Sequence, residues 1–282
     1  YPTSSEAITA EIGLKRIAGS SLGSLPTGAD WLRRGDSFYS RRRNSDALAA
    51  YDEAILNGLS KAEKNSANYK RGQTFFRLRR YSEASTAFKK LGSSEKARFW
   101  LARSLARSGK VKKSLLIFEE LAQTGAKKLG DRSLYLAATL LEGEGQVSIA
   151  KKYLLKLIEA NSAYAKAALW RVAWLSFNEK RYEDARTQFV KLAKSHEDPL
   201  DALAPRYWSS RMKILLGDLT GTTELEHLAK EYPLTYYGWR ARQGSRRESF
   251  PELERTLTLS VQSNLNEMRI NRARILTKIG LP

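Results

Sequence analysis

Apolar residues in this chain recur at helical spacing. Trp170, Ala173, Trp174 and Phe177 stand at positions i, i+3, i+4 and i+7, so they fall on one side of an α-helix. No segment alternates apolar and polar residues over the length of a strand. The pattern predicts about a dozen or more helices and no β-sheet.

A longer period of small and large residues is superimposed on the helical one. Small residues stand at positions 35, 72, 102, 138, 173 and 209, and apolar or small residues follow 3, 12, 16 and 19 positions later. Small residues let two helices approach closely, and large residues fill the groove between them. Six matches in near-constant register therefore predict six helix pairs. In the first unit the residues are Gly35, Phe38, Ala47, Tyr51 and Ala54.

Short polar or glycine-containing segments separate the helices of the predicted pairs, at 79–82, 108–110, 143–145 and 180–182. Spacing and turns resemble those of tetratricopeptide repeats, which are helix–turn–helix units of about 34 residues. We therefore expect an all-α fold, a right-handed α-solenoid or superhelix of tetratricopeptide-like helix pairs with a concave face. The predicted organisation is a helical lead-in over 1–30, repeats over 31–233 and a C-terminal helical segment over 234–282.

The charge balance points to an anionic partner. The chain has 49 Lys and Arg against 30 Asp and Glu, a net charge of +19. Nucleic acid, acidic lipid and an anionic cell-wall polymer all satisfy such a surface. Most of the individual cations are expected on solvated helix faces, in groups such as Arg41 to Arg43. No apolar run approaches the roughly 18 residues of a membrane span.

The sequence offers little for metal or cofactor chemistry. It has no cysteine, and its two histidines, His196 and His227, stand far apart. This excludes disulfides, thiolate ligands and a cysteine nucleophile, and it argues against a closed zinc site. Phosphate-loop and dinucleotide motifs are also missing. We predict no cofactor. The neighbouring carboxylates Glu119 with Glu120 and Glu142 with Glu144 are interpreted as helix-end solvation and capping.

One segment is distinctive: Glu-Tyr-Pro-Leu-Thr-Tyr-Tyr-Gly-Trp-Arg-Ala over 231–241. It resembles the end of the superhelical domain in soluble lytic murein transglycosylases of the Slt type, and the stretch over 272–281 is similar to the family's next element. The resemblance implies a periplasmic location, peptidoglycan as partner, and a covalently linked catalytic domain that cleaves glycan strands. Tyr236, Tyr237, Trp239 and Arg240 are the candidates for contact with substrate or with that domain.

The chain itself is not expected to be catalytic. In the family a catalytic Glu is followed by Ser, and a Gly-Leu-Met-Gln-like run comes later. Glu248 and Ser249 imitate the first part, but the later run does not occur. Arg246 and Arg247 favour the ionised form of Glu248, whereas a general acid must hold its proton.

Two other functions remain open. The first alternative is a tetratricopeptide adaptor that binds a protein or peptide in its concave face. The second and weaker one is a basic solenoid that binds nucleic acid, whose binding would depend steeply on salt.

Overall fold

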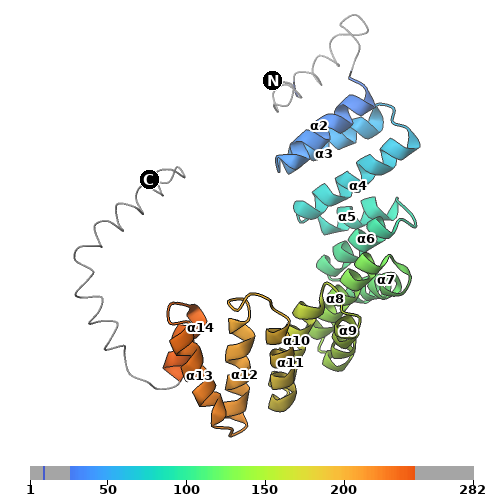
Figure 1. Ribbon diagram of the computed structural model, residues 1–282. Coiled ribbons are helices and arrows are strands. Elements are labelled where there is room, and N and C mark those ends of the chain that lie inside the picture. Colours follow the sequence, from blue (N-terminus) through green and yellow to red (C-terminus); the bar gives the residue numbers. More distant parts are fainter. Residues whose placement is uncertain (1–8, 10–25, 245–282) are drawn as a thin grey trace, which may run out of the picture. The chain divides into compact units, whose positions relative to one another are not determined.

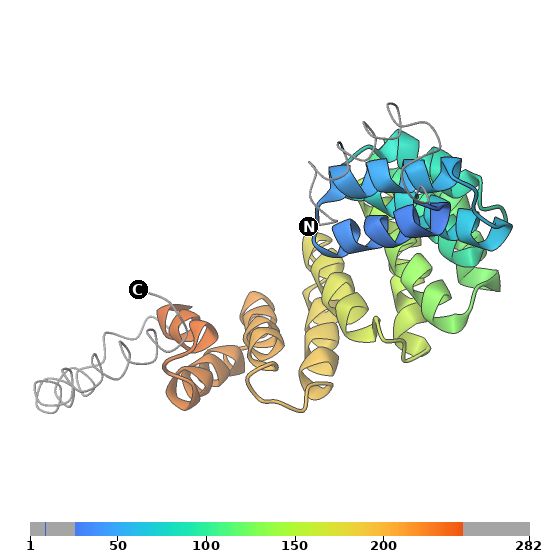
Figure 2. The same cartoon turned by 90° about the horizontal axis from the view of Figure 1, so that it is seen from above.

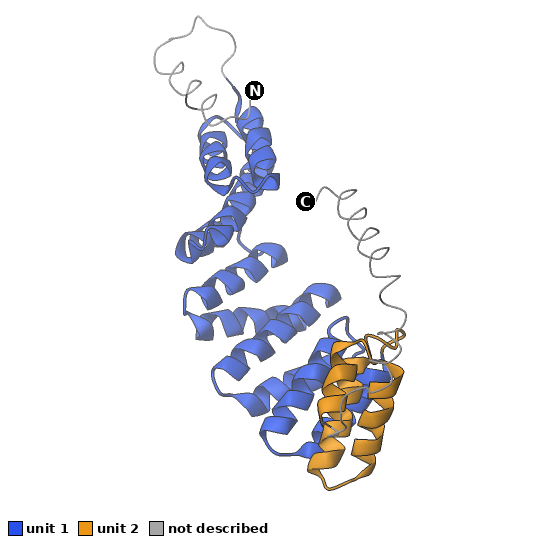
Figure 3. Ribbon diagram, turned by 90° about the vertical axis from the view of Figure 1, so that its left-hand side faces the viewer, with its two compact units in different colours: residues 1–195 blue, residues 196–282 orange. Residues whose placement is uncertain are grey.

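The structure is a computed structural model that describes residue 9 and residues 26–244 (Figure 1 and Figure 2). Contacts divide the chain into two compact units, residues 1–195 and residues 196–282, and each is described by itself (Figure 3). Most of the predicted lead-in over 1–30, Glu248 and the stretch 272–281 lie outside the described residues. Within the described part no strand is present, and no helix is long and apolar enough to span a membrane.

The described residues of the first unit form five helix pairs, each made of two neighbouring helices that reverse direction (Figure 1). In chain order the pairs are α2 (Gly28–Ser40) with α3 (Asn44–Leu56), α4 (Lys61–Arg77) with α5 (Tyr81–Lys89), α6 (Glu95–Arg107) with α7 (Val111–Thr124), α8 (Lys127–Gly143) with α9 (Val147–Glu159), and α10 (Ala165–Asn178) with α11 (Tyr182–Lys194). The expected all-α repeat fold is confirmed.

The small and large residues of the predicted register pack against each other within each helix pair. A β-carbon added to Gly35 would lie 2.5 Å from the ring of Tyr51, and one added to Gly72 would lie 2.8 Å from the ring of Phe88. Both rings are buried. Real side chains do not approach so closely, so these glycines are what allows the second helix to pack against the first.

The spacing of 30 residues between the small positions 72 and 102 has a local cause. Helix α5 has 9 residues, whereas the second helices of the other four pairs have 13 or 14. Leu91, which the register predicts at a helical core position, lies beyond the end of α5 and is half-buried.

The turns between paired helices share one backbone feature. Seven residues after each of the five small residues of this unit, the chain adopts a positive φ, at Arg42, Arg79, Gly109, Gly145 and Lys180. This conformation ends the first helix and starts the reversal into the second. Glycine adopts it without strain, and three pairs use a basic residue instead.

The first helices of successive pairs lie close together. Helix α2 contacts α4, α4 contacts α6, and α6 contacts α8. Arg171 of α10 contacts Glu142 and Tyr135 of α8. The first helices α2, α4, α6, α8 and α10 therefore form a common side of this unit, which we call the inner face.

The second unit contains α12 (Leu203–Leu215), α13 (Thr220–Glu231) and α14 (Tyr236–Gly244) among its described residues. Helices α12 and α13 form the sixth predicted pair, because Leu225 and Leu228 are buried and a β-carbon on Gly221 would meet the carbonyl oxygen of Ser210 at 2.5 Å. Helix α14 packs on both. The domain boundary predicted between residues 233 and 234 falls inside this unit.

Candidate ligand-binding pocket

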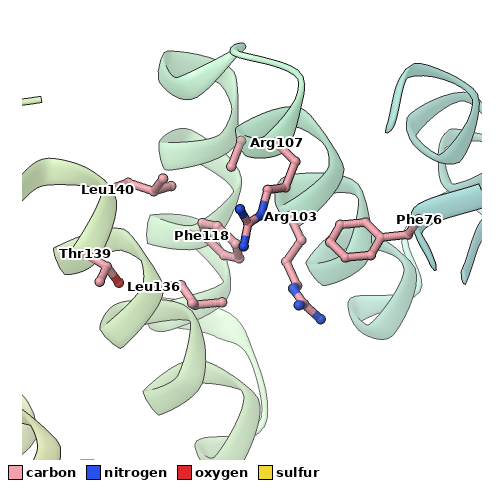
Figure 4. Close-up of a pocket in the computed structure, with 8 residues that line it drawn as sticks. Phe76, Arg103, Arg107, Phe118, Leu136, Thr139 and Leu140 are labelled. Atoms are coloured by element: carbon pink, nitrogen blue, oxygen red, sulfur yellow. The ribbon is translucent and has the colours of Figure 1, made fainter. Parts of the chain in front are cut away.

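A pocket of about 350 Å³ opens on the inner face of the first unit (Figure 4). Helices α4, α6, α7 and α8 supply its walls. Most of the lining is apolar, and two guanidinium groups of α6 join it. The lining residues are Phe76, Arg103, Ala106, Arg107, Phe118, Leu136, Thr139 and Leu140. Such a lining suits an apolar group that carries a negative charge beside it.

Arg103 is held against aromatic rings. Its guanidinium carbon lies 4.3 Å from the ring centre of Trp100 and 4.8 Å from that of Phe76. Both distances are typical of a cation over an aromatic face. The side chain is half-buried, and burial lowers the pKa of Arg103, as do the charges of Arg132 and Arg107. The rings fix the position of a cation that its surroundings do not neutralise.

Arg107 and Arg132 complete what we call the arginine cluster, the set of Arg103, Arg107 and Arg132. The guanidinium carbons of Arg132 and Arg103 lie 4.9 and 5.9 Å from the centre of the same ring, that of Phe99. Arg107 and Arg132 are exposed. Within residues 26–244, none of the three forms an ion pair with a carboxylate.

The acidic residues of the same helix pair are engaged elsewhere. Glu120 is paired with Arg98, and Glu119 accepts a hydrogen bond of 2.8 Å from the hydroxyl of Tyr153. Glu95 accepts a bond of 3.2 Å from the backbone N–H of Ala126. The arginine cluster is therefore left with its charges exposed to an incoming ligand.

The neighbouring parts of the inner face contain ion pairs. Between α2 and α4, Lys70 forms an ion pair with Asp36 at 2.5 Å. Between α8 and α10, Arg171 forms one with Glu142 and also donates a 3.0 Å hydrogen bond to the hydroxyl of Tyr135. In both places a half-buried cation of a first helix has a carboxylate partner, unlike Arg103.

The residues singled out from the sequence lie on α14 of the second unit. Tyr236 and Trp239 are 60% and 47% exposed, so both are accessible to a ligand or another domain. Tyr237 is half-buried and packs against Tyr207 with ring centres 5.5 Å apart. Arg240 donates a hydrogen bond of 3.2 Å to the hydroxyl of Tyr236. Their role in contacting substrate or a catalytic domain stays a prediction.

The sequence interpretation missed the arginine cluster. Arg103 and Arg107 follow the small residue Ala102 by one and five positions, and such positions can face the neighbouring first helix. The register therefore indicated that Arg103 and Arg107 can face the neighbouring first helix. It did not show whether they form ion pairs, because that depends on contacts between different helix pairs. Glu142, interpreted as a capping residue, is instead half-buried and paired with Arg171.

Comparison with known families and structures agrees with the helix pairs. The tetratricopeptide repeat family model matches residues 32–96 and 135–202. A search of curated protein sequences found no match to this chain.

Several solved structures share the fold. The apo form of RapI superposes with a TM-score of 0.56 at 15% sequence identity, and the alignment covers 98% of this chain and 82% of the RapI chain. A tetratricopeptide repeat protein from Parabacteroides merdae gives 0.52 at 14% identity, covering 80% and 94%. Pseudomonas aeruginosa pilF gives 0.52 at 14%, covering 77% and 97%. The chain therefore carries an all-helical domain of tetratricopeptide repeats.

Proposed function

We propose that the chain is a binding module that holds an extended peptide segment of a partner protein on the inner face of its first unit. The pocket beside Ala106 is the observation that carries this proposal. It is an open, largely apolar pocket in a face built of stacked helices. Its size lies within the range of about 300–1,000 Å³ typical of ligand sites.

The construction of the pocket supports binding rather than internal packing. Phe118 is fully buried and forms part of the wall, whereas Leu136 and Leu140 are only half-buried. Apolar side chains left half-open in a pocket gain by contact with an apolar ligand group. Because they stand on helices, they are held in place before binding, which lowers its entropic cost.

A peptide display experiment tests this function. The chain is panned against a library of random short peptides, and the selected peptides are measured on two variants. Ala106→Phe places a ring into the pocket and should weaken binding by at least about tenfold, a loss of about 1.4 kcal/mol. Ala49→Phe is the control, because Ala49 is exposed on the second helix α3. Peptides that bind both variants as they bind the unchanged chain would disprove the proposal.

The resemblance over 231–241 favours a second candidate function, that of the superhelical domain of a periplasmic lytic transglycosylase. The supporting observation is the exposure of Tyr236 and Trp239 on α14, since aromatic faces of this kind stack on sugars or pack on a neighbouring domain. Purified peptidoglycan sacculi test it. Binding that is lost in a Tyr236→Ala, Trp239→Ala double variant supports the assignment, and binding unaffected by it contradicts the assignment. We expect no release of anhydro-muropeptides by this chain alone.

A further inference from the structure

We infer that the segment bound on the inner face is acidic, with a carboxylate held by Arg103, Arg107 and Arg132 next to an apolar side chain in the pocket. The inference rests on the proposed peptide-binding function and adds the chemistry of the partner. It follows from how Arg103 is held and from the absence of a carboxylate partner for the cluster among residues 26–244. The half-buried cations on either side, Lys70 and Arg171, do have such partners.

The rings around Arg103 prepare it for a carboxylate. A guanidinium group that stacks on an aromatic face still has its N–H donors along its edge. That edge matches the two oxygens of a carboxylate, and paired N–H donation to both oxygens is the strong form of this contact. Trp100 and Phe76 hold the group in advance, so less side-chain entropy is lost on binding.

The charges of the cluster also favour an anion. Arg132 and Arg107 act on Arg103 as like charges, and the carboxylates of this helix pair are bound to other partners. A ligand carboxylate placed among the three groups would relieve their repulsion and gain charge-assisted hydrogen bonds. No rearrangement of Glu119 or Glu120 is needed for this.

The surroundings favour a peptide over a nucleic acid. A nucleic acid strand needs a row of cations that follows its phosphates. On either side of the cluster the inner-face cations Lys70 and Arg171 are already paired with carboxylates. The pocket next to the cluster is lined by Leu136, Leu140 and Phe118, which suit an aliphatic or aromatic side chain. A single anionic group followed by an apolar one is the pattern of an acidic peptide.

The test compares two labelled synthetic peptides by fluorescence anisotropy on the full chain. The acidic peptide carries Glu residues on both sides of a central Leu, and the neutral peptide has Gln in place of each Glu. We expect the acidic peptide to bind at least about tenfold more tightly, because each charge-assisted hydrogen bond contributes roughly that factor. Its binding should weaken as salt is raised, and that of the neutral peptide should not.

Variants locate the effect. The double variant Arg103→Gln, Arg132→Gln should lose the preference for the acidic peptide. Its control, Lys112→Gln with Lys113→Gln, removes the same number of charges from exposed positions of α7 and should keep the preference. Arg103→Lys retains the charge but not the planar group, and should weaken the acidic peptide alone. Thermal melting by circular dichroism verifies that each variant is folded.

The outcomes separate this inference from the proposed function. Equal binding of both peptides, with both weakened by Ala106→Phe, would leave the peptide-binding function in place and overturn the acidic preference. Loss of the preference in the Lys112, Lys113 control would show that overall charge is responsible, and would also overturn it. A single-stranded oligonucleotide that displaces the acidic peptide and depends on Arg103 would replace the peptide by a nucleic acid. Failure of Ala106→Phe to affect any peptide would remove both proposals.

Discussion

We call the junction between the first helices of two successive pairs a step. Two neighbouring steps of the inner face have different residues at equivalent positions. Between α8 and α10, Arg171 stands two residues before the small residue Ala173 and pairs with Glu142 of α8. Between α6 and α8, the residue two positions before the small residue Ala138 is Leu136, and α6 has Ala106 at the position equivalent to Glu142. The step from α8 to α10, which an ion pair fills, is the closed step. The step from α6 to α8, which leaves a pocket, is the open step.

The pKa shifts of the two arginines run in opposite directions. Burial acts to lower the pKa of Arg171, but the hydrogen bond with Tyr135 and the charge of Glu142 outweigh it and raise the pKa. For Arg103, burial and the charges of Arg132 and Arg107 all lower it. The surroundings therefore favour the charged form of Arg171 and disfavour that of Arg103. A repeat fold tolerates such a step because each pair contacts only its neighbours.

The largest effect is expected from breaking the ion pair of the closed step. Glu142→Gln keeps the shape of the side chain but leaves Arg171 half-buried without its carboxylate. We expect a loss of about 1–3 kcal/mol in the free energy of unfolding, measured with urea. Glu144→Gln is the matched control, because Glu144 is exposed nearby, and it should change the stability by less than about 0.5 kcal/mol. Equal effects of the two substitutions would show that the pair does not stabilise the step.

The second-largest effect is expected at Glu119, a carboxylate of the α6–α7 pair that binds Tyr153 instead of the arginine cluster. Burial, followed by the hydrogen bond to Glu119 and its charge, raises the pKa of Tyr153 from 10.0 to about 12. Since the folded pKa is above the unfolded value, this stabilising contribution is fully present below pH 10 and is lost as the pH rises through 12. Tyr153→Phe should cost about 1 kcal/mol at neutral pH. It should also flatten the decline in stability above pH 10. An unchanged alkaline decline would assign it to other groups.

The helix pairs could be predicted because their packing is local. Gly35 and Tyr51, or Gly72 and Phe88, are joined by one short turn, so a fixed spacing in the sequence becomes a fixed contact in space. The positive φ that follows seven residues after Gly72 could not be recognised as easily, because Arg79 occupies it instead of glycine.

The arginine cluster could not be predicted in the same way. Arg103 and Arg132 belong to different helix pairs, and both lie over the ring of Phe99. Whether they are free for a ligand depends on the partners of Glu119 and Glu120, which are determined by contacts on other faces. Composition indicated an anionic partner, but the position of the unpaired charge became visible only in the assembled unit.

A carboxylate added to the open step should make it resemble the closed one. Thr139 lines the pocket from α8 and is half-buried. Because Thr139 lines the same pocket as Arg103 and Arg107, we expect the carboxylate of Thr139→Glu to lie near their guanidinium groups and the stability to rise by about 0.5–1 kcal/mol. The acidic peptide should then bind more weakly, since its place is taken. The control Thr139→Gln has the same size without the charge and should show neither change. A destabilised Thr139→Glu would mean that the cluster is already neutralised.

The smallest effect on stability is expected from removing the cation of the open step. Arg103→Met keeps apolar contact with Trp100 and Phe76 but loses the charge. Cation–π attraction is lost, worth about 0.5–1 kcal/mol, and the cost of burying a charge near Arg132 and Arg107 is removed as well. The two terms oppose each other, so the free energy of unfolding should change by less than about 0.5 kcal/mol. Raising the salt concentration should stabilise the unchanged chain slightly more than Arg103→Met, because salt screens a repulsion that only the former contains. A loss as large as that of Glu142→Gln would contradict the comparison, because it would make Arg103 a stabilising residue like Arg171.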